Sequence, residues 1–375
     1  MTLAFGTRPE AIKMAPVHRA LSERNDLEVR VLLTGQHREQ LEDALVPFGL
    51  RGDANLAVMT ERQRLPDLAG RILPQAARAL AELGTDYVLV HGDTLTTFAV
   101  AWAAFLEGIP VGHVEAGLRS HNLQNPFPEE ANRKLTDQIA DLLLAPTPNA
   151  RANLLAEGLP EERVLVTGQT GIDAILFAAK VGQPPSGLPA GPRVTVTLHR
   201  RENWPRLESI ARALAEVARA FPGITFVYPL HKNPAVREAV VPVLETVENF
   251  VLLEPLDYFE MAALLKTSLL VVTDSGGLQE EGAALGVPVA VVRDVTERPE
   301  GLETGALVLA GTAPEGIRRT VSELLANEER RQRMARAENP YGDGRAGERV
   351  AKAVAWRLGL GPKPTEFTPE VKRGP

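Results

Sequence analysis

The sequence predicts an α/β fold of two doubly wound domains, each built on a largely parallel sheet. Short apolar runs alternate along the chain with Ala-, Leu-, Glu- and Arg-rich stretches whose apolar residues recur every three or four positions. The 375 residues exceed what one compact core usually holds and suit two domains of ordinary size. A Pro-, Gly- and Ser-rich stretch at 182–192 separates two series of this alternation, and we expect a loop or linker there that acts as a hinge.

Each apolar run is expected to form a strand. Continuous runs of Val and Leu fit strands that are buried on both faces, as in a parallel sheet. The runs lie at residues 29–33, 87–90, 142–145, 164–167, 194–198, 225–228, 269–273 and 287–292.

The stretches between the runs predict amphipathic helices, for example at 65–83. We expect a first domain at 1–170 and a second domain at 171–344. A helix at about 345–360 is free to pack back on the first domain. The end of the chain, 361–375, is rich in Pro and charge and is expected to lie loose on the surface.

Composition argues against several classes of function. Hydrophobic residues make up 44% of the chain and charged residues 24%, the balance of a soluble globular protein, and no apolar run approaches the roughly 20 residues that span a bilayer. The absence of cysteine removes disulfides, thiolate nucleophiles and Cys-type metal sites. The net charge of −7 argues against general nucleic-acid binding. With no secretory leader at the start, we expect a cytoplasmic protein that binds neither membrane nor nucleic acid.

Two strand-to-helix junctions predict anion sites, because ligands bind at the carboxyl ends of strands in open α/β sheets. The first junction places Arg8 and Lys13 on the first turns of a helix, where helix N-termini already favour phosphate. Its alternative is an ordinary capped helix with two surface cations. No Walker A loop or GxGxxG fingerprint is present, so ATPase and dehydrogenase functions lack their usual support.

The second junction is the stronger one. Ser275, Gly276 and Gly277 follow a wholly apolar strand, so a hydroxyl and two residues without Cβ atoms precede the free N–H groups of a helix. This arrangement suits a diphosphate, and Glu281, one turn into the helix, is suited to ribose hydroxyls. The alternative is a common Asp/Ser N-cap with a flexible turn.

Three acidic turns predict an acid/base cluster. Asp93, Glu115 and Glu129 stand at or near strand ends within about forty residues, as general acid/base chemistry requires. Taken singly, each is better explained as an N-cap or a surface ion pair; taken together, they favour a catalytic cluster.

Two histidines, His199 and His231, also follow strands, in the second half of the chain. A single histidine is more often a structural hydrogen-bonding group than a catalyst, and the paired spacing of metal ligands is absent, so no metal site is expected. Beside neighbouring arginines, both suit the neutralisation of phosphate charge.

Nine short motifs follow one another along the chain: FGTRPEAIKMAP (5–16), GQHREQL (35–41), HGDT (91–94), VGHVEAGLR (111–119), PEEANR (128–133), HRREN (199–203), TDSGGLQEE (273–281), RDVTERPE (293–300) and NPYGDG (339–344). Together they resemble the non-hydrolysing UDP-N-acetylglucosamine 2-epimerases. The resemblance runs from about residue 5 to the helix before the tail. It implies two Rossmann-like domains facing across a cleft, a GT-B-type architecture, and a homodimer.

The resemblance also implies an activity: reversible conversion of UDP-GlcNAc to UDP-ManNAc by elimination of UDP to a glycal and re-addition, without metal, nicotinamide or other cofactor. By motif, Arg8 and Lys13 would lie near the nucleotide, and the UDP-binding residues would be Ser275, Gly276, Gly277, Glu281 and Arg298. The catalytic residues at the sugar and its diphosphate would be Asp93, Glu115, Glu129 and His199.

Some bacterial members of this family carry a second, regulatory UDP-GlcNAc site. Gln36 and His37 match its Gln-His-x-x-Gln stretch, Arg62 matches a further contact, and Glu39 replaces the later Gln. Three other functions stay open at this point. They are a hydrolysing epimerase that releases UDP and ManNAc, a GT-B glycosyltransferase, and a non-catalytic sugar-nucleotide-binding module.

Overall fold

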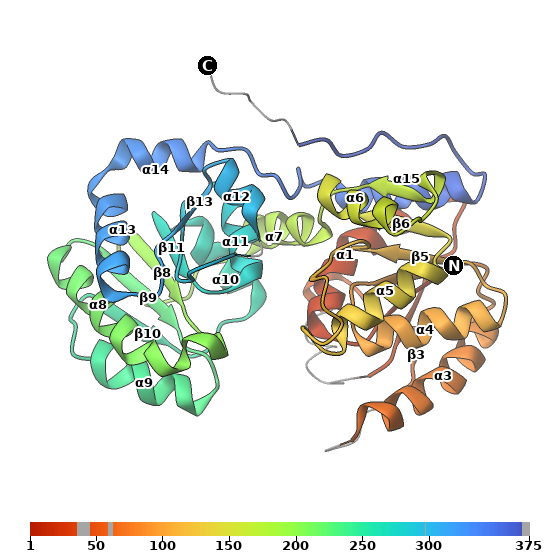
Figure 1. Cartoon of the computed structure of the whole chain (residues 1–375), viewed down its shortest axis with the longest axis horizontal. Coiled ribbons are helices and arrows are strands. Elements are labelled where there is room, and N and C mark those ends of the chain that lie inside the picture. The colour runs from red at the N-terminus through yellow and green to blue at the C-terminus, as the bar shows by residue number, and fades with distance from the viewer. Residues whose placement is uncertain (36–45, 59–62, 297, 370–375) are drawn as a thin grey trace. The chain divides into compact units, whose positions relative to one another are not determined.

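The computed structural model describes residues 1–35, 46–58, 63–296 and 298–369, and the chain divides into two compact units (Figure 1). Unit 1 comprises Met1–Ala174 and Tyr341–Thr368, and unit 2 begins at Ile175 and reaches Pro340. Each unit has its own sheet and its own core, and each is described below by itself.

Unit 1 contains, within its described residues, a seven-stranded sheet of order β3-β2-β1-β4-β5-β6-β7 in which every neighbouring pair is parallel. Its strands are β1 (Thr2–Phe5), β2 (Arg30–Leu33), β3 (Ala54–Asn55), β4 (Val88–His91), β5 (Val111–Val114), β6 (Leu142–Ala145) and β7 (Val164–Val166). Its helices are α1 (Arg8–Ser22), α3 (Leu65–Glu82), α4 (Leu95–Leu106), α5 (Glu129–Ile139), α6 (Pro148–Ala156), the start of α7 (Thr170–Val181) and α15 (Ala346–Arg357).

Alternation along the strands divides the core of unit 1 between the two faces of the sheet. In β1, Leu3 and Phe5 are buried in the cluster formed with α1 and α15, whereas Ala4 faces the cluster formed with α3 and α4. The order 2-1-4-5 reverses direction between β1 and β4, and open α/β sheets bind ligands at the carboxyl ends of the strands beside such a switch point.

Unit 2 repeats the plan with a six-stranded parallel sheet, over the part that the structure describes, of order β10-β9-β8-β11-β12-β13 and a switch point between β8 and β11. Its strands are β8 (Arg193–Thr197), β9 (Thr225–Pro229), β10 (Phe250–Leu253), β11 (Leu270–Thr273), β12 (Val289–Val291) and β13 (Leu307–Leu309). Its helices are α8 (Leu207–Ala220), α9 (Pro234–Leu244), α10 (Tyr258–Lys266), α11 (Gly276–Ala284), α12 (Pro299–Glu303), α13 (Pro314–Ala326) and α14 (Glu328–Ala335). Helices α8, α9 and α13 share one core cluster with the sheet.

The α/β class, the predicted strands and the predicted helix at 65–83 are confirmed, with boundaries that differ by one or two residues. The stretch 182–192 forms neither helix nor strand, as expected of a loop. The two units divide before this stretch, inside α7, between Ala174 and Ile175, where the expected domain boundary was 170/171. Asp173 accepts hydrogen bonds from the first residues of α15 in unit 1, whereas Ile175 and Ala178 pack with Ala262 of α10 in unit 2.

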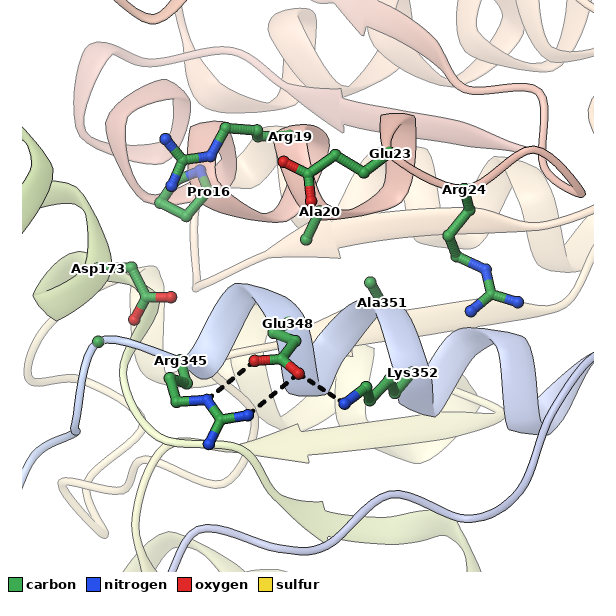
Figure 2. A pocket seen from close by; sticks show the side chains of 11 residues that line it. Pro16, Arg19, Ala20, Glu23, Arg24, Asp173, Arg345, Glu348, Ala351 and Lys352 are labelled. Atoms are coloured by element: carbon green, nitrogen blue, oxygen red, sulfur yellow. Dashed lines mark hydrogen bonds and ion pairs between the residues drawn. The ribbon is translucent and has the colours of Figure 1, made fainter.

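Helix α15 lies beside α1 and buries Val350, Ala353 and Val354 in the core of unit 1 (Figure 2). The segment after it differs from the loose tail expected from 361 onward. The Phe367 N–H donates to the carbonyl of Val166 at 2.8 Å, and the Phe367 side chain is only 6% exposed. Apolar burial and a backbone hydrogen bond to the edge strand β7 therefore hold this segment through about residue 368.

Candidate functional site

The turn that leaves β1 is fixed by one buried carboxylate. Glu10, on the first turn of α1, accepts hydrogen bonds from the Gly6 N–H and from the N–H and hydroxyl of Thr7, at 2.7–3.1 Å. Its other oxygen accepts from the hydroxyls of Thr94 and Thr97, which begin α4. Glu10 therefore links the start of α1 to the start of α4, on either side of the switch point.

Helix α1 presents both cations predicted for this junction. Arg8 is exposed and forms no ion pair with any residue that the structure describes. Lys13 lies one turn further on, and its Nζ is 2.5 Å from Oε2 of Glu115, which directly follows β5. The two predicted cations therefore differ: Arg8 is exposed, and Lys13 is paired with Glu115, a predicted catalytic carboxylate.

Glu115 is almost completely buried and has a positive φ of 68°, an uncommon conformation for a residue with a side chain. Burial opposes its ionisation, but the Lys13 ammonium, His91 and hydrogen bonds from Lys13 and Gln169 outweigh burial and lower its pKa to about 2. The carboxylate is therefore an anion throughout the neutral range.

His91 and Gln169 complete this cluster, and our sequence-based prediction assigned neither to the site. His91 Nε2 lies 3.7 Å from Oε2 of Glu115, and burial lowers the pKa of His91 to about 3, so the ring is neutral. Neither ring nitrogen of His91, nor Oε1 of Gln169, has a hydrogen-bond partner among the described residues. The motif HGDT contains His91 and was a usable signal; nothing in the sequence around Gln169 pointed to Glu115.

Asp93 lies in the turn after β4, beside two residues of α5. Its carboxylate forms an ion pair with Arg133, and its backbone carbonyl accepts a hydrogen bond from Asn132 at 3.0 Å. Glu129, the first residue of α5, is half-buried and lies three to four positions before these two residues, on the same face of the helix. Its neighbour Glu130 is fully buried and accepts from backbone N–H groups, so Glu130 is structural.

The turn after β8 in unit 2 is organised by Asp274, which is fully buried after β11. Its carboxylate accepts from the backbone N–H groups of His199 and Arg200 and from the Asn203 side chain, at 3.0–3.1 Å. The rings of His199 and His231 stack with centroids 5.5 Å apart. Burial lowers the pKa of His199, against the raising effect of Asp274. The two predicted histidines therefore form a stacked pair at the ends of β8 and β9.

The turn after β11 leads into the N-terminus of α11. Ser275 is the N-cap of α11, and its hydroxyl makes no capping hydrogen bond. A Cβ atom on Gly276 would lie 3.5–3.6 Å from the guanidinium groups of Arg200 and Arg298, so both cations flank this turn. Nothing lies within 4 Å of the Cβ position of Gly277.

Two acidic residues of α11 have different environments. Glu280 binds Arg298 Nε at 2.7 Å and so orients that guanidinium. Glu281, predicted to contact the ribose, is half-buried and raises the pKa of Tyr258, which burial already raises. Arg200, Glu280 and Tyr258 were absent from the sequence-based prediction, and Arg200 had a signal in the motif HRREN.

The three residues that match the regulatory site, Gln36, His37 and Arg62, lie outside the described residues. A groove between α1 and α15, with a volume of about 480 Å³, contains none of the predicted site residues and is lined by charges of both signs (Figure 2). The described residues hold no group of three His, Asp or Glu side chains that could bind a metal ion. Over the same residues, no helix is long and apolar enough to cross a membrane.

Each unit therefore gathers predicted site residues at the carboxyl edge of its own sheet. Unit 1 brings Lys13 and Glu115 into contact, with Asp93 following the neighbouring strand β4, and unit 2 brings His199 to His231.

Comparisons with known proteins agree with one another. The family described as UDP-N-acetylglucosamine 2-epimerase matches residues 19–355. The UDP-N-acetylglucosamine 2-epimerase of Salmonella typhimurium is 46% identical over 370 residues, covering 95% of this chain and 98% of the relative.

Solved structures give the same result. UDP-GlcNAc 2-epimerase from Neisseria meningitidis, bound to UDP-GlcNAc, superposes with a TM-score of 0.84 at 40% identity, covering 95% of this chain and 98% of the other. The enzyme from Methanocaldococcus jannaschii, in complex with UDP-GlcNAc and UDP, superposes with a TM-score of 0.77 at 32% identity, covering 95% and 99%.

Proposed function

Because the chain belongs to the UDP-N-acetylglucosamine 2-epimerase family, we propose that it interconverts UDP-GlcNAc and UDP-ManNAc by inverting C2 of the sugar. Unit 2 binds UDP at the turn 275–277, and unit 1 acts on the sugar. The observation that carries the proposal is the pair of carboxylates, Asp93 and Glu115, that follow neighbouring strands beside the switch point of unit 1.

The C2 hydrogen has no adjacent carbonyl group, so its direct removal would be slow. When the bond from C1 to the UDP oxygen breaks, the electron pair leaves with UDP and the sugar becomes oxocarbenium-like. Loss of the C2 proton to a carboxylate then gives a C1–C2 double bond. A proton delivered to the opposite face of C2 and return of the UDP oxygen to C1 complete the inversion, so atoms and charge balance.

Departure of UDP needs positive charge at the diphosphate. Arg200 and Arg298 flank Gly276, and the N-terminus of α11 directs its N–H groups to the same turn. We assign His199, next to Arg200, to donate a hydrogen bond to the diphosphate. This set of donors supports the assignment of unit 2 as the UDP-binding unit.

Proton transfer at C2 needs groups on both faces, and we assign Asp93, Glu115 and Glu129 to these roles. Glu115 is ionised in the free protein and can accept a proton. A diphosphate that drew the Lys13 ammonium away would raise the pKa of Glu115 and make this carboxylate a stronger base. Pairing with Lys13 thus couples the basicity of Glu115 to the presence of substrate.

Proton NMR with UDP-GlcNAc in D₂O tests the proposal. We expect UDP-ManNAc with deuterium at C2, and a loss of about 100-fold or more in rate for Asp93→Asn, Glu115→Gln and Glu129→Gln. Glu348→Gln, in the groove between α1 and α15, is the matched control and keeps the activity. Free ManNAc plus UDP would identify a hydrolysing epimerase instead. UDP binding without turnover would favour a glycosyltransferase or a binding module.

We also propose that the protein is cytoplasmic and forms a homodimer. Phe105 and Leu106 at the end of α4 and Leu135 on the adjacent α5 are 50–59% exposed, and such exposed apolar side chains support contact with a second copy. Sedimentation of the wild type and of Phe105→Glu tests this: a dimer that the variant converts to a monomer is expected.

A further inference from the structure

A row of buried ionisable side chains leads away from the Gly92 carbonyl, in the turn that carries Asp93. His113 on β5 and Asp137 on α5 are fully buried, and the Arg119 side chain, which follows β5, is fully buried as well. Arg119 also binds Glu157 at the end of α6, at 2.7 Å. These residues do not belong to the proposed catalytic set, so their burial needs another explanation.

The hydrogen bonds of His113 determine where its protons are. Nε2 lies 2.7 Å from the carbonyl oxygen of Gly92, and a carbonyl oxygen can only accept, so Nε2 carries a proton. Nδ1 lies 2.6 Å from Oδ1 of Asp137, whose other oxygen accepts from Arg119 at 2.7 Å. Because Arg119 stabilises this carboxylate as an anion, the proton between Nδ1 and Asp137 resides on Nδ1.

We propose that His113 is a positioning residue, a buried imidazolium that holds the Gly92 carbonyl and thereby the backbone that carries Asp93. Its effect on catalysis rests on the proposed function, whereas its protonation state does not.

The other contacts of this turn show why the His113 contact matters. The Gly92 N–H donates to the carbonyl of Val114 at 2.9 Å, and Asn132 donates to the Asp93 carbonyl at 3.0 Å. Gly92 has a positive φ of 70°, so the turn is not held by a regular strand or helix. The hydrogen bond from His113 to the Gly92 carbonyl connects the Gly92–Asp93 peptide to the buried side chains of Asp137 and Arg119. Without it, Asp93 keeps its chemistry but loses its precise placement, and rate is sensitive to shifts of about 1 Å.

The first test is nitrogen NMR of the wild-type protein labelled at the histidine ring nitrogens, with Asp137→Asn used to assign His113. We expect both ring nitrogens of His113 to carry protons in the folded protein. In Asp137→Asn, the amide can donate to Nδ1, so His113 is expected to become neutral with a proton on Nε2 only. A neutral His113 in the wild type would overturn the imidazolium.

The second test separates positioning from stability. His113→Met is expected to lower kcat about 10- to 100-fold while KM for UDP-GlcNAc stays within about threefold. Asp137→Asn keeps the bond from Nε2 to the Gly92 carbonyl, so its kcat is expected to stay within about threefold of wild type. A kcat in Asp137→Asn as low as in His113→Met would overturn the positioning role.

Thr2→Val is the matched control, because it removes a buried side-chain hydrogen bond, to Thr85, elsewhere in the same sheet. Its kcat is expected to equal that of wild type, and a His113→Met enzyme as active as this control would also overturn the proposal. If His113→Met does not fold, the NMR test still decides the protonation state, and a kcat of Asp137→Asn more than about tenfold below wild type would overturn the positioning role. A wild-type protein without epimerase activity would contradict the proposed function and leave the NMR result to be judged by itself.

Discussion

At the scale of single residues, Lys13 determines the charge state of Glu115. Lys13→Met would leave the buried carboxylate without its cation, so we expect the pKa of Glu115 to rise from about 2 to above its ordinary value. The unpaired buried charge should also lower the free energy of unfolding at pH 7 by about 3 kcal/mol. Urea denaturation and carboxyl-carbon NMR titration measure the two effects.

The pH dependence of this pair has a definite sign. The folded pKa of Glu115 lies below its unfolded value, so the pair's contribution to stability is complete above pH 4.5 and is lost as the pH falls toward 2. Lys13→Met should lack this acid-dependent contribution. Lys352→Met, which removes an exposed pair with Glu348, is the control and should change stability by less than about 1 kcal/mol. Equal losses in both variants would contradict the prediction.

The site residues that could be predicted from sequence are those that directly follow an apolar strand, because that position alone puts them at the carboxyl edge of a parallel sheet. Asp93 and Glu115 follow apolar strands, and parallel strands bring their carboxyl ends to one edge. The partners of such residues could not be found in this way. Asp137 and His113 are 24 positions apart, and Lys13 and Glu115 are 102 apart, so each contact exists only after the sheet has formed.

At the scale of elements, two carboxylates fix the starts of helices. Glu10→Ala removes the acceptor that joins the start of α1 to the start of α4, and it leaves several buried donors unpaired. We expect a loss of about 3 kcal/mol in the free energy of unfolding, measured by urea denaturation. Glu260→Ala, in the exposed capping box of α10, is the control and should cost about 1 kcal/mol or less.

The Thr7-x-x-Glu10 spacing is a capping box that sequence could have revealed; the contact with Thr94 could not be read from it.

Asp173 joins α7 to α15 by accepting from the N–H groups of Ala346 and Gly347 at 3.1 and 2.8 Å, and Figure 2 shows it beside the start of α15. Burial raises its pKa to about 6, against the lowering effect of these hydrogen bonds. Between pH 4 and 6 the folded state therefore binds more protons than the unfolded state. The contribution of Asp173 to stability is greatest below pH 4 and falls as the pH rises through 6.

Asp173→Asn should remove this dependence. Relative to the wild type, the variant is expected to gain about 3 kcal/mol of stability as the pH rises from 4 to 7. Urea denaturation of both proteins across this range measures the difference, in which the titrations of all other groups cancel. Parallel curves would show that burial does not perturb this carboxyl group.

At the scale of the whole molecule, the sheet of unit 2 is built from one continuous stretch of chain, whereas unit 1 is built from two separate stretches. The fragment 175–340 contains the complete second sheet and is expected to fold alone and to bind UDP, as dispersed NMR spectra and calorimetry would show. The fragment 1–174 lacks α15 and is expected to fold only when a peptide covering 341–368 is added. Folding of 1–174 alone would contradict this expectation.

The alternation of strands and helices was sufficient to predict two doubly wound sheets, because each sheet is built from local βαβ steps. The expected boundary at 170/171 gave no sign that the division lies inside α7, because α7 is one uninterrupted helix whose two ends pack with different partners. Nor could the alternation show that Phe367 is buried, since a short Pro-rich segment has no periodicity that reveals packing.

The return of the chain to unit 1 has a consequence for synthesis on the ribosome. Domains usually fold in the order in which they emerge, the N-terminal one first. Here the first unit lacks α15 until residues beyond 340 have been made, whereas all strands of the second unit have already emerged by then. The unit that begins the chain is thus completed last, and its apolar face for α15, around Val17 and Leu21, stays uncovered during most of translation.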